Sequence, residues 1–240
     1  VKFMTGAKLT GVARQGNYLS ATVAVGDTIQ TVTAEYVLVS VGRRPRTDGI
    51  GLAEAGVATE RAKVMVNQHF QTNVRGVYAI GDCNGQAMLA HAASAQGVAA
   101  VEHALGHKPA YYGEIIPACI YTHPEVASVG LTEELAISRK IEYRVGRFPL
   151  AGNGKSLIES GGTGLVKIIS GEKHGEILGA HIFGPRATDL IGEAALAMRL
   201  EATVDELVST IHAHPTVSEA IAEAALAVNG ISIHWPPARR

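Results

Sequence analysis

A histidine and a glutamate near the C-terminal end of the chain have the types and spacing of an acid–base pair. His214 stands before Pro215, which fixes the backbone ahead of an expected helix, and Glu219 falls in the first turn of that helix. A carboxylate bound to one imidazole nitrogen holds the tautomer and raises the basicity of the other nitrogen. The spacing therefore indicates a general acid–base function, which contributes roughly 10²–10⁴ in rate where it operates.

The same segment also fits a structural role. Thr216 and Glu219 have the spacing of a capping box, with threonine as the N-cap and glutamate at N3. The two roles are compatible, because a carboxylate that caps a helix keeps a second oxygen for His214. His212 and His123 resemble His214 in their surroundings, and His123 also precedes a proline. We interpret each of them as a packed or surface histidine.

Other reactive patterns fail on their details. Residues 152–156 read Gly-Asn-Gly-Lys-Ser, but Pro149 occupies the position where a phosphate-binding loop needs its first glycine. Cys83 and Cys119 are far apart and form no CxxC pattern, which excludes a disulfide framework and favours a reducing, intracellular compartment. Neither cysteine has zinc-type spacing with a histidine, so we expect no metal site.

The elements that must position these residues begin with β structure. Residues 18–25 alternate between apolar and other side chains, a Gly-Asp turn follows, and residues 31–41 are β-branched and apolar. Residues 37–41 predict a strand that is buried on both faces and ends at Gly42. The charged, proline-containing loop that follows indicates a boundary.

Residues 49–110 predict a second unit with α/β character. Residues 77–80 indicate a short buried strand that is stopped by Gly81 and Asp82, and residues 87–105 predict a long buried helix. A strand, an acid-bearing turn and a helix form the arrangement in which ligands lie at the carboxyl ends of strands.

From residue 115 onward the pattern predicts an α+β domain, a mixed sheet followed by helices. Strands are predicted at 119–129, 141–148, 164–170 and 176–183, and helices at 189–200, 204–211 and 216–228. No internal repeat or low-complexity segment interrupts this order.

The composition is that of a globular protein. Of the 240 residues 47% are hydrophobic and 18% are charged, which argues against disorder. The net charge of −1 gives no reason to expect capture of nucleic acid or of an anionic membrane. No apolar run approaches the ~20 residues of a membrane helix, and the first residues do not have the pattern of a secretory signal.

Several motifs together resemble one family. Residues 212–219, His-Ala-His-Pro-Thr-Val-Ser-Glu, are similar to the signature of dihydrolipoamide dehydrogenases, which are class I pyridine nucleotide-disulfide oxidoreductases. Glutathione reductases share its His-Pro-Thr core but usually lack the first histidine, and mercuric reductases lack the motif. Residues 116–126 resemble the segment that opens the family's dimer-interface domain, and residues 178–186 resemble a strand and turn of that domain. The resemblance covers nearly the whole chain.

The resemblance implies cofactor contacts for a second set of residues. Asp82 would accept a hydrogen bond from a ribityl hydroxyl of FAD, although an ordinary strand-end turn also explains it. Met88, Leu89, Ala90 and His91 would open a helix whose positive end lies near flavin N1 and O2, and the alternative is a plain core helix. Gly42 would lie close to NAD, although a glycine at a strand end needs no ligand.

Two parts of the family pattern are missing from the sequence. No GxGxxG follows a strand, so neither pyrophosphate fingerprint is present, and no Cys-x4-Cys redox pair occurs. We therefore expect a fragment with three parts. They are residues 1–47, the end of an NAD-binding domain; residues 48–114, the second part of an FAD-binding domain; and residues 115–240, the dimerisation domain. The first two would form an incomplete α/β portion.

For the intact enzyme the resemblance implies oxidation of dihydrolipoyl groups by NAD through a disulfide and FAD. His214 would take the thiol proton and Glu219 would orient it, acting across a homodimer interface on the partner's disulfide. The implied partner is the lipoyl domain of a 2-oxo acid dehydrogenase complex, in the cytoplasm or alternatively the mitochondrial matrix. Alternatives are a related FAD-dependent reductase with another substrate, or a non-catalytic dimerisation module. The isolated chain is expected to be inactive and colourless, because one aspartate and one helix end do not replace a pyrophosphate site.

Overall fold

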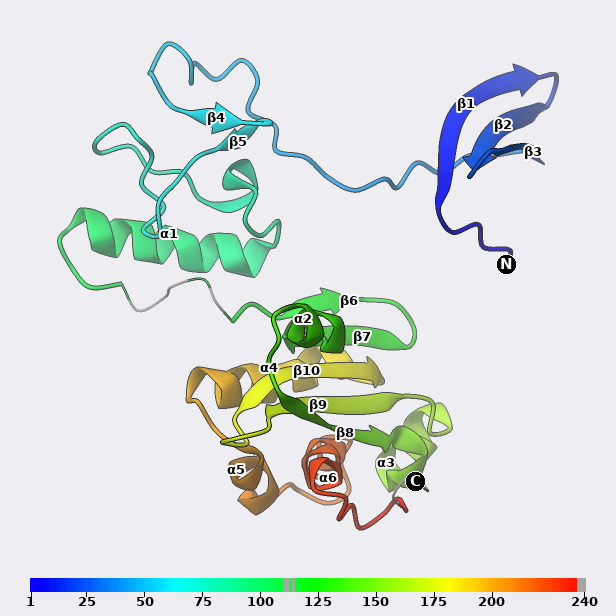
Figure 1. Cartoon of the computed structure of the whole chain (residues 1–240), viewed down its shortest axis with the longest axis vertical. Coiled ribbons are helices and arrows are strands. Elements are labelled where there is room, and N and C mark those ends of the chain that lie inside the picture. The colour runs from blue at the N-terminus through cyan, green and yellow to red at the C-terminus, as the bar shows by residue number, and fades with distance from the viewer. Residues whose placement is uncertain (110–112, 114, 237–240) are drawn as a thin grey trace. The chain divides into compact units, whose positions relative to one another are not determined.

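The computed structural model describes residues 1–109, 113 and 115–236, and the chain divides into two compact units, Val1–Arg44 and Pro45–Arg240. The first unit is an antiparallel sheet of three strands, β1 (Ala7–Gln15), β2 (Tyr18–Val25) and β3 (Thr28–Ala34), in the order β1-β2-β3 (Figure 1). Gly16 and Gly26 begin its two-residue hairpin loops with φ of 63° and 57°, where a side chain would be strained.

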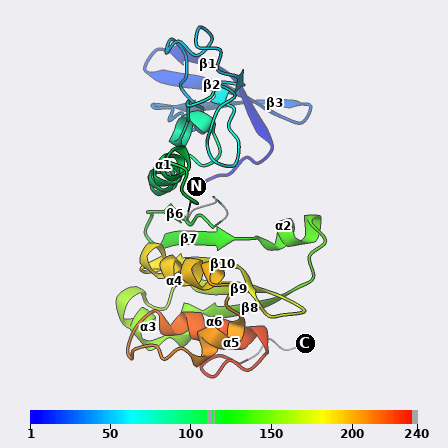
Figure 2. The same cartoon turned by 90° about the vertical axis from the view of Figure 1, so that its left-hand side faces the viewer.

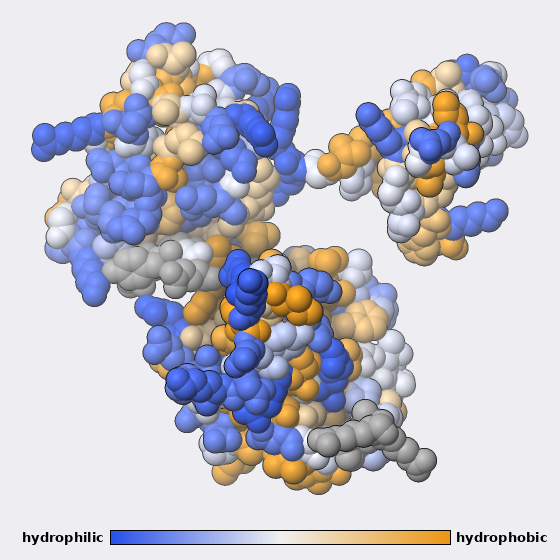
Figure 3. Space-filling model, viewed as in Figure 1, coloured by the Kyte–Doolittle hydropathy of each residue, from blue (hydrophilic) through white to orange (hydrophobic). Residues whose placement is uncertain are grey.

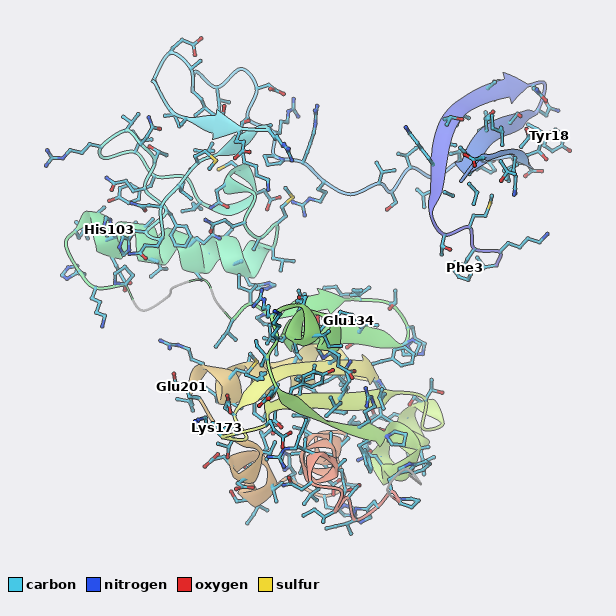
Figure 4. The ribbon with its side chains drawn as sticks, viewed as in Figure 1. Phe3, Tyr18, His103, Glu134, Lys173 and Glu201 are labelled. Atoms are coloured by element: carbon cyan, nitrogen blue, oxygen red, sulfur yellow. The ribbon has the colours of Figure 1, made fainter. Side chains whose placement is uncertain are left out.

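The strands of this first unit remain largely exposed. Every residue of β1 is exposed, and so are Val32 of β3 and Tyr18, which is labelled in Figure 4. Among the described residues, buried hydrophobic side chains begin only at Val57. The unit therefore has paired strands, with a register shift between Leu9 and Gly11, but no hydrophobic core of its own.

The strand predicted at residues 37–41 is wrong. β3 ends at Ala34, which pairs with Leu19, and no strand is assigned to residues 36–44. Leu38 is 91% exposed, and this connecting segment is drawn with hydrophobic colour at its surface in Figure 3. A strand needs a neighbour for its backbone N–H and C=O groups, and the part of the chain that the structure describes pairs none with this segment.

Residues 45–109 contain little regular structure apart from one helix. The elements are the two-residue strands β4 (Thr59–Glu60) and β5 (Lys63–Val64), the 3₁₀ turn η1 (Gly81–Asn84) and helix α1 (Ala90–Ala104). Small hydrophobic clusters support them, one formed by Val57, Val64 and Ala79 and another by Phe70, Ala99 and Ala100.

Two predictions for this segment need correction. Residues 77–80 are not a strand, because only an isolated bridge between Tyr78 and Gln71 is formed. The predicted helix is present but begins at Ala90, and it is not buried all round, since Val98 and Val101 are exposed. The alanines on one side of α1 are buried, so the apolar composition of the helix reflects a single packed face.

A five-stranded antiparallel sheet organises residues 115–236. Its strands are β6 (Ala118–Ile120), β7 (Glu125–Gly130), β8 (Tyr143–Pro149), β9 (Leu165–Gly171) and β10 (Ile177–Gly184), in the order β6-β7-β10-β9-β8. Every neighbouring pair is antiparallel. The helices are α2 (Glu133–Ser138), α3 (Gly154–Ser160), α4 (Ala187–Arg199), α5 (Val204–Ser209) and α6 (Glu219–Val228), and η2 (Leu150–Gly152) precedes α3.

The core of this part lies between the sheet and two helices. α4 packs on β7 and β10, α6 packs on β8 and β9, and α5 packs on α6 (Figure 1, Figure 2). Ile168 and Ile182 of adjacent strands are buried toward these helices with Ile191 of α4 and Ile221 of α6. Gly146 lets α6 approach closely, because a Cβ there would collide with the α6 backbone.

The α+β prediction for this part is confirmed, with differences at particular elements. Residues 119–129 form two strands, because Pro124 lacks an N–H and the chain turns there. The helix predicted from Thr216 begins at Glu219. The sequence analysis missed α2 and α3, which are short. None of the described helices has the length and apolar character to cross a membrane.

Candidate functional site

His214 and Glu219 are in direct contact, as the sequence predicted. The Nδ1 atom of His214 lies 2.9 Å from Oε1 of Glu219. The His214 side chain is 80% exposed, whereas that of Glu219 is 29% exposed. A ring held at Nδ1 by a carboxylate keeps Nε2 as a proton acceptor, and here the rest of the ring is open to solvent.

Glu219 binds His214 as predicted, but the predicted capping box, with Thr216 as the N-cap and Glu219 at N3, is wrong. Its second oxygen, Oε2, accepts a hydrogen bond of 2.9 Å from the N–H of Thr216. Ser218 occupies the N-cap position, Glu219 is the first residue of the helix, and the Thr216 hydroxyl donates to the carbonyl of Ala213. One carboxylate thus orders the 214–219 segment and orients the imidazole.

These contacts also set the charge of Glu219. Partial burial alone would raise the pKa of the Glu219 carboxyl, but hydrogen bonds from Thr216 and His214 outweigh it and hold that pKa below its ordinary value. The positive charges of His214 and His234 act in the same direction. The carboxylate therefore stays ionised, which is the form that accepts both hydrogen bonds.

Asn153 fixes this segment from outside it. Its Oδ1 caps α3 by accepting from the N–H of Ser156 at 2.8 Å, and its Nδ2 donates to the carbonyl of Thr216 at 2.9 Å. Asn153 is buried, and so is Val217, which belongs to the core. The sequence analysis did not single out Asn153, although asparagine before a short helix is a recognisable N-cap signal.

The two other histidines behave as interpreted. The Nε2 atom of His212 lies 2.8 Å from Oε1 of Glu193, and the His212 side chain is only 7% exposed, so it is packed. His123 is exposed. The carboxylate next to it, Glu125, is engaged by the N–H and hydroxyl of Thr188. Among these three histidines, only His214 combines an exposed ring with a hydrogen bond to a partly buried carboxylate.

Asp82 lies in a turn that is tightly bound to α1. Gly81 has a φ of 72°, and a Cβ there would approach the Cβ of Ala93 to 3.0 Å, so both the backbone and the space require glycine. Gln96 of α1 is 1% exposed, and its Oε1 accepts from the N–H of Gly81 at 2.7 Å and from Nδ2 of Asn84 at 2.9 Å. Gln96 and Asn84 are positioning residues that the sequence analysis missed, and only a buried polar residue in an alanine-rich helix hinted at them.

Met88, Leu89, Ala90 and His91 form the entry to α1. Leu89 is the N-cap, and no side chain caps the helix start. Met88 and Leu89 are half-buried, whereas Ala90 and His91 are exposed. The Nε2 atom of His91 lies 2.8 Å from the carbonyl oxygen of Pro117. An acceptor side chain at Asp82 and an uncapped helix start on elements tied together by Gln96 have the chemistry to bind hydroxyls and an anionic group.

Gly42 belongs to the other unit and has no comparable setting. Its φ is 95°, which favours glycine, but no atom lies within 4 Å of the position that a Cβ would take.

The described residues offer no other reactive centre of the kinds considered. No group of three or more His, Cys, Asp or Glu side chains among them is placed to hold a metal ion. Both cysteines are free, and burial raises the pKa of the Cys119 thiol, which disfavours the reactive thiolate.

The sequence matches two related family models. The model described as "Pyridine nucleotide-disulphide oxidoreductase" matches residues 1–97, and its dimerisation domain matches residues 116–225. The dihydrolipoyl dehydrogenase of Bacillus subtilis is 42% identical over 238 residues, which cover 98% of this chain and 50% of that protein. The mitochondrial dihydrolipoyl dehydrogenase of Pisum sativum is 44% identical over 98% of this chain and 47% of its own length.

A solved structure agrees with these matches. The crystal structure of LpdA from Mycobacterium tuberculosis superposes with a TM-score of 0.81 at 32% sequence identity, covering 91% of this chain and 48% of that one. The chain thus spans about half the length of the curated relatives it matches.

Proposed function

Because the chain belongs to the pyridine nucleotide-disulphide oxidoreductases, we propose that it supplies the acid–base pair and the subunit interface of a dihydrolipoyl dehydrogenase. The reaction would oxidise a dihydrolipoyl group to lipoyl and reduce NAD to NADH. The observation that carries the proposal is the 2.9 Å contact between Glu219 and His214, whose ring is otherwise exposed.

The proposed role of His214 follows from its geometry. With Nδ1–H donating to Glu219, the Nε2 atom can accept the proton of a dithiol substrate, and the resulting thiolate is the nucleophile that attacks a disulfide. Glu219 then stabilises the imidazolium that forms. Because the pKa of Glu219 is lowered, the carboxylate remains charged through this proton transfer.

The proposed flavin contacts involve Asp82 and the start of α1. FAD, if bound there, would supply the two-electron redox chemistry that links the dithiol–disulfide centre to NAD. Asp82 would accept a hydrogen bond from a ribityl hydroxyl, and the backbone N–H groups from Ala90 onward would face the electron-rich edge of the flavin. Gln96 would keep these two contacts in register. Gly42, which has a φ of 95° and open space where a Cβ would lie, would be close to NAD in the intact enzyme.

We further propose that the site is completed by a second copy of the chain. His214 has no cysteine partner among its described contacts, and its ring faces outward, as transfer of a proton to a group on another subunit requires. Next to this segment, α4, α5 and residues 210–213 line a surface groove of about 660 Å³. Leu200 and Ile211 on it are exposed, which suits a protein contact. A lipoyl domain as partner, and the cytoplasm or the mitochondrial matrix as compartment, remain parts of the proposal.

A chimera tests the proposed function. This chain would replace the matched half of the Bacillus subtilis dihydrolipoyl dehydrogenase, and turnover of dihydrolipoamide with NAD would be measured. We expect His214→Gln to lower kcat by about 10²–10⁴ with flavin absorbance unchanged. His123→Gln is the matched control, because His123 is also exposed and also precedes a proline, and it should leave kcat within about twofold.

Two outcomes would count against the proposal. Turnover of His214→Gln at the wild-type rate would remove His214 from the mechanism. A chimera that binds flavin and dimerises, yet reduces no NAD, would favour a non-catalytic dimerisation module. A comparison of dihydrolipoamide with glutathione disulfide as substrates would identify a reductase of different specificity.

A further inference from the structure

The chain leaves the core for a long segment just before the acid–base pair. Leu207 of α5 and Val217 ahead of α6 are buried. Between them, every residue of the segment 208–215 except His212 is exposed. In the described chain, no hydrogen bond between two backbone groups involves residues 211–215. Side chains therefore have to fix the place from which the acid–base histidine extends.

His212 is the packed residue of this segment. Its side chain is 7% exposed, whereas Ile211 before it is 97% exposed and the side chain of His214 is 80% exposed. The Nε2 atom of His212 lies 2.8 Å from Oε1 of Glu193, and its Nδ1 atom lies 3.0 Å from the carbonyl oxygen of Thr210. One ring thus joins the segment to helix α4 and to the end of α5.

Both partners of His212 are themselves held in place. Glu193 lies inside α4, and this helix packs on β7 and β10. The N–H and the hydroxyl of Thr210 donate to the carbonyl of Glu206, at 3.0 and 2.7 Å, so that Thr210 is tied to the last turn of α5. His212 therefore connects the exposed segment to two helices of the packed domain.

We propose that His212 is a positioning residue of the acid–base site, which is held by Glu193 and fixes the chain on the N-terminal side of His214. On the C-terminal side, Glu219 already binds the His214 ring and the N–H of Thr216. The inference rests on the function proposed above only in treating His214 and Glu219 as an acid–base pair. The contacts of His212 do not depend on that function.

Contacts on both sides of His214 restrict its ring more than contacts on one side do. Glu219 holds the Nδ1 atom, but the direction in which Nε2 points also depends on the backbone of Ala213 and His214. His212 fixes that backbone from the preceding side. Without this contact the segment would be free as far back as α5, and the ring would sample more orientations. A base that is correctly oriented for less of the time catalyses proton transfer less well.

No other side chain holds the segment from this side. Val208 and Ile211 are exposed, and the hydroxyl of Ser209 donates to the carbonyl of Glu206 within α5. Among the described residues of 208–215, the side chain of His212 is therefore the one that bonds to a helix preceding α5.

The first test measures the mobility of the segment by nitrogen-15 relaxation of the whole chain. We expect backbone order parameters of about 0.85 at Ala213 and His214 in the wild type, and values falling toward about 0.6 in His212→Ala. His212→Gln should restore much of the difference, because its amide nitrogen is as many bonds from Cβ as Nε2 is and can still donate to Glu193. His174→Ala is the matched control, because His174 is an exposed histidine in the β9–β10 turn, and it should leave these order parameters unchanged.

Two further measurements separate positioning from a general effect on the fold. Glu193→Ala should lower the same order parameters, and the double variant with His212→Ala should lower them no further than either single variant does. In the chimera described above, His212→Ala should lower kcat by about 10- to 100-fold with KM within about twofold, because the base loses its orientation. His212→Gln should recover most of this loss, and His174→Ala should leave kcat within about twofold. Amide spectra report whether each variant is folded.

The outcomes separate this inference from the proposed function. Unchanged order parameters at Ala213 and His214 in His212→Ala, with an intact fold, would overturn it. Order parameters lowered equally throughout residues 115–236 would show a general loss of packing and would overturn it as well. So would a mobile segment with unchanged kcat in a chimera where His214→Gln does lower kcat. Wild-type turnover in His214→Gln would instead remove the catalytic assignment without altering the relaxation result.

Discussion

The N-terminal unit and the C-terminal sheet domain are both built on antiparallel strands, yet only the second holds candidate catalytic side chains in a defined arrangement. In Val1–Arg44 two hairpins pair the strands, with one register shift between Leu9 and Gly11, while the residues of β1 are all exposed. In residues 115–236 the strands of the sheet contribute side chains to a core that they share with α4 and α6. Gly42 in the first region has open surroundings, whereas His214 in the second has a defined partner.

The difference shows what fixes an exposed catalytic candidate. His214 is itself outside the core, but Val217 and Ile221 just beyond it are buried. Asn153 and Glu219 then order the residues between. Hydrogen bonds between strands fix the backbone only where the strands pair. Packing in the core also restrains the position of a side chain several residues away. An exposed ring can be rigidly placed only where the chain on at least one side of it is packed.

Amide hydrogen exchange should reveal the largest contrast between the two regions. We expect the amides of β9 and β10 to exchange at least about 10³ times more slowly than those of β1–β3, because opening the former disrupts a core and opening the latter does not. Exchange of the whole chain followed by peptide mass spectrometry measures this. Equal protection in both regions would mean that the first unit has stabilising contacts beyond those its exposed strands provide.

A pair of glycine substitutions sharpens the same comparison. Gly146→Ala in β8 should destabilise the C-terminal domain by about 3–4 kcal/mol, since the added Cβ would collide with the α6 backbone at Ala224 and Val228. Gly11→Ala in β1 meets no atom within 4 Å and should change stability by less than about 1 kcal/mol. Urea unfolding of both variants, followed by circular dichroism, tests the difference. Equal effects would mean that α6 can move away from the sheet without loss.

The sequence predicted the parts of this fold whose patterns are local. The strands and helices after residue 115 appear at nearly the predicted places, because alternation and helical spacing there agree with burial. The strand prediction for residues 37–41 was wrong, because an apolar run forms a strand only if another strand pairs with it. The strand prediction for residues 77–80 was wrong for the same reason.

In the candidate site, too, the contacts between residues close in sequence were predictable and the contacts between distant segments were not. The His214–Glu219 contact was predictable, because the two residues are close in sequence and Pro215 places His214 just before the helix on which Glu219 lies. The contacts of Asn153 with Thr216, of Gln96 with Gly81 and of His234 with Glu223 were not predicted. Each joins segments that the fold brings together, and no periodicity in the sequence specifies the partner of a single buried amide or carboxylate.

The smallest expected effect concerns the pH dependence of the ordered 214–219 segment. Because the folded-state pKa of Glu219 is lowered, its ionised form contributes stability that is present above the unfolded-state pKa and is lost as the pH falls through the folded-state value. Glu219→Gln should therefore cost roughly 1 kcal/mol or less at neutral pH, and the difference from wild type should shrink toward zero in acid. Urea unfolding of both proteins between neutral and acid pH measures it. Glu142→Gln, at an exposed position, is the control and should show no such trend. A difference in stability that persists unchanged in acid would mean that Glu219 orders residues 214–219 through packing. The polar contacts of this segment would then not be the cause of its order, and they would not explain how it differs from the N-terminal unit.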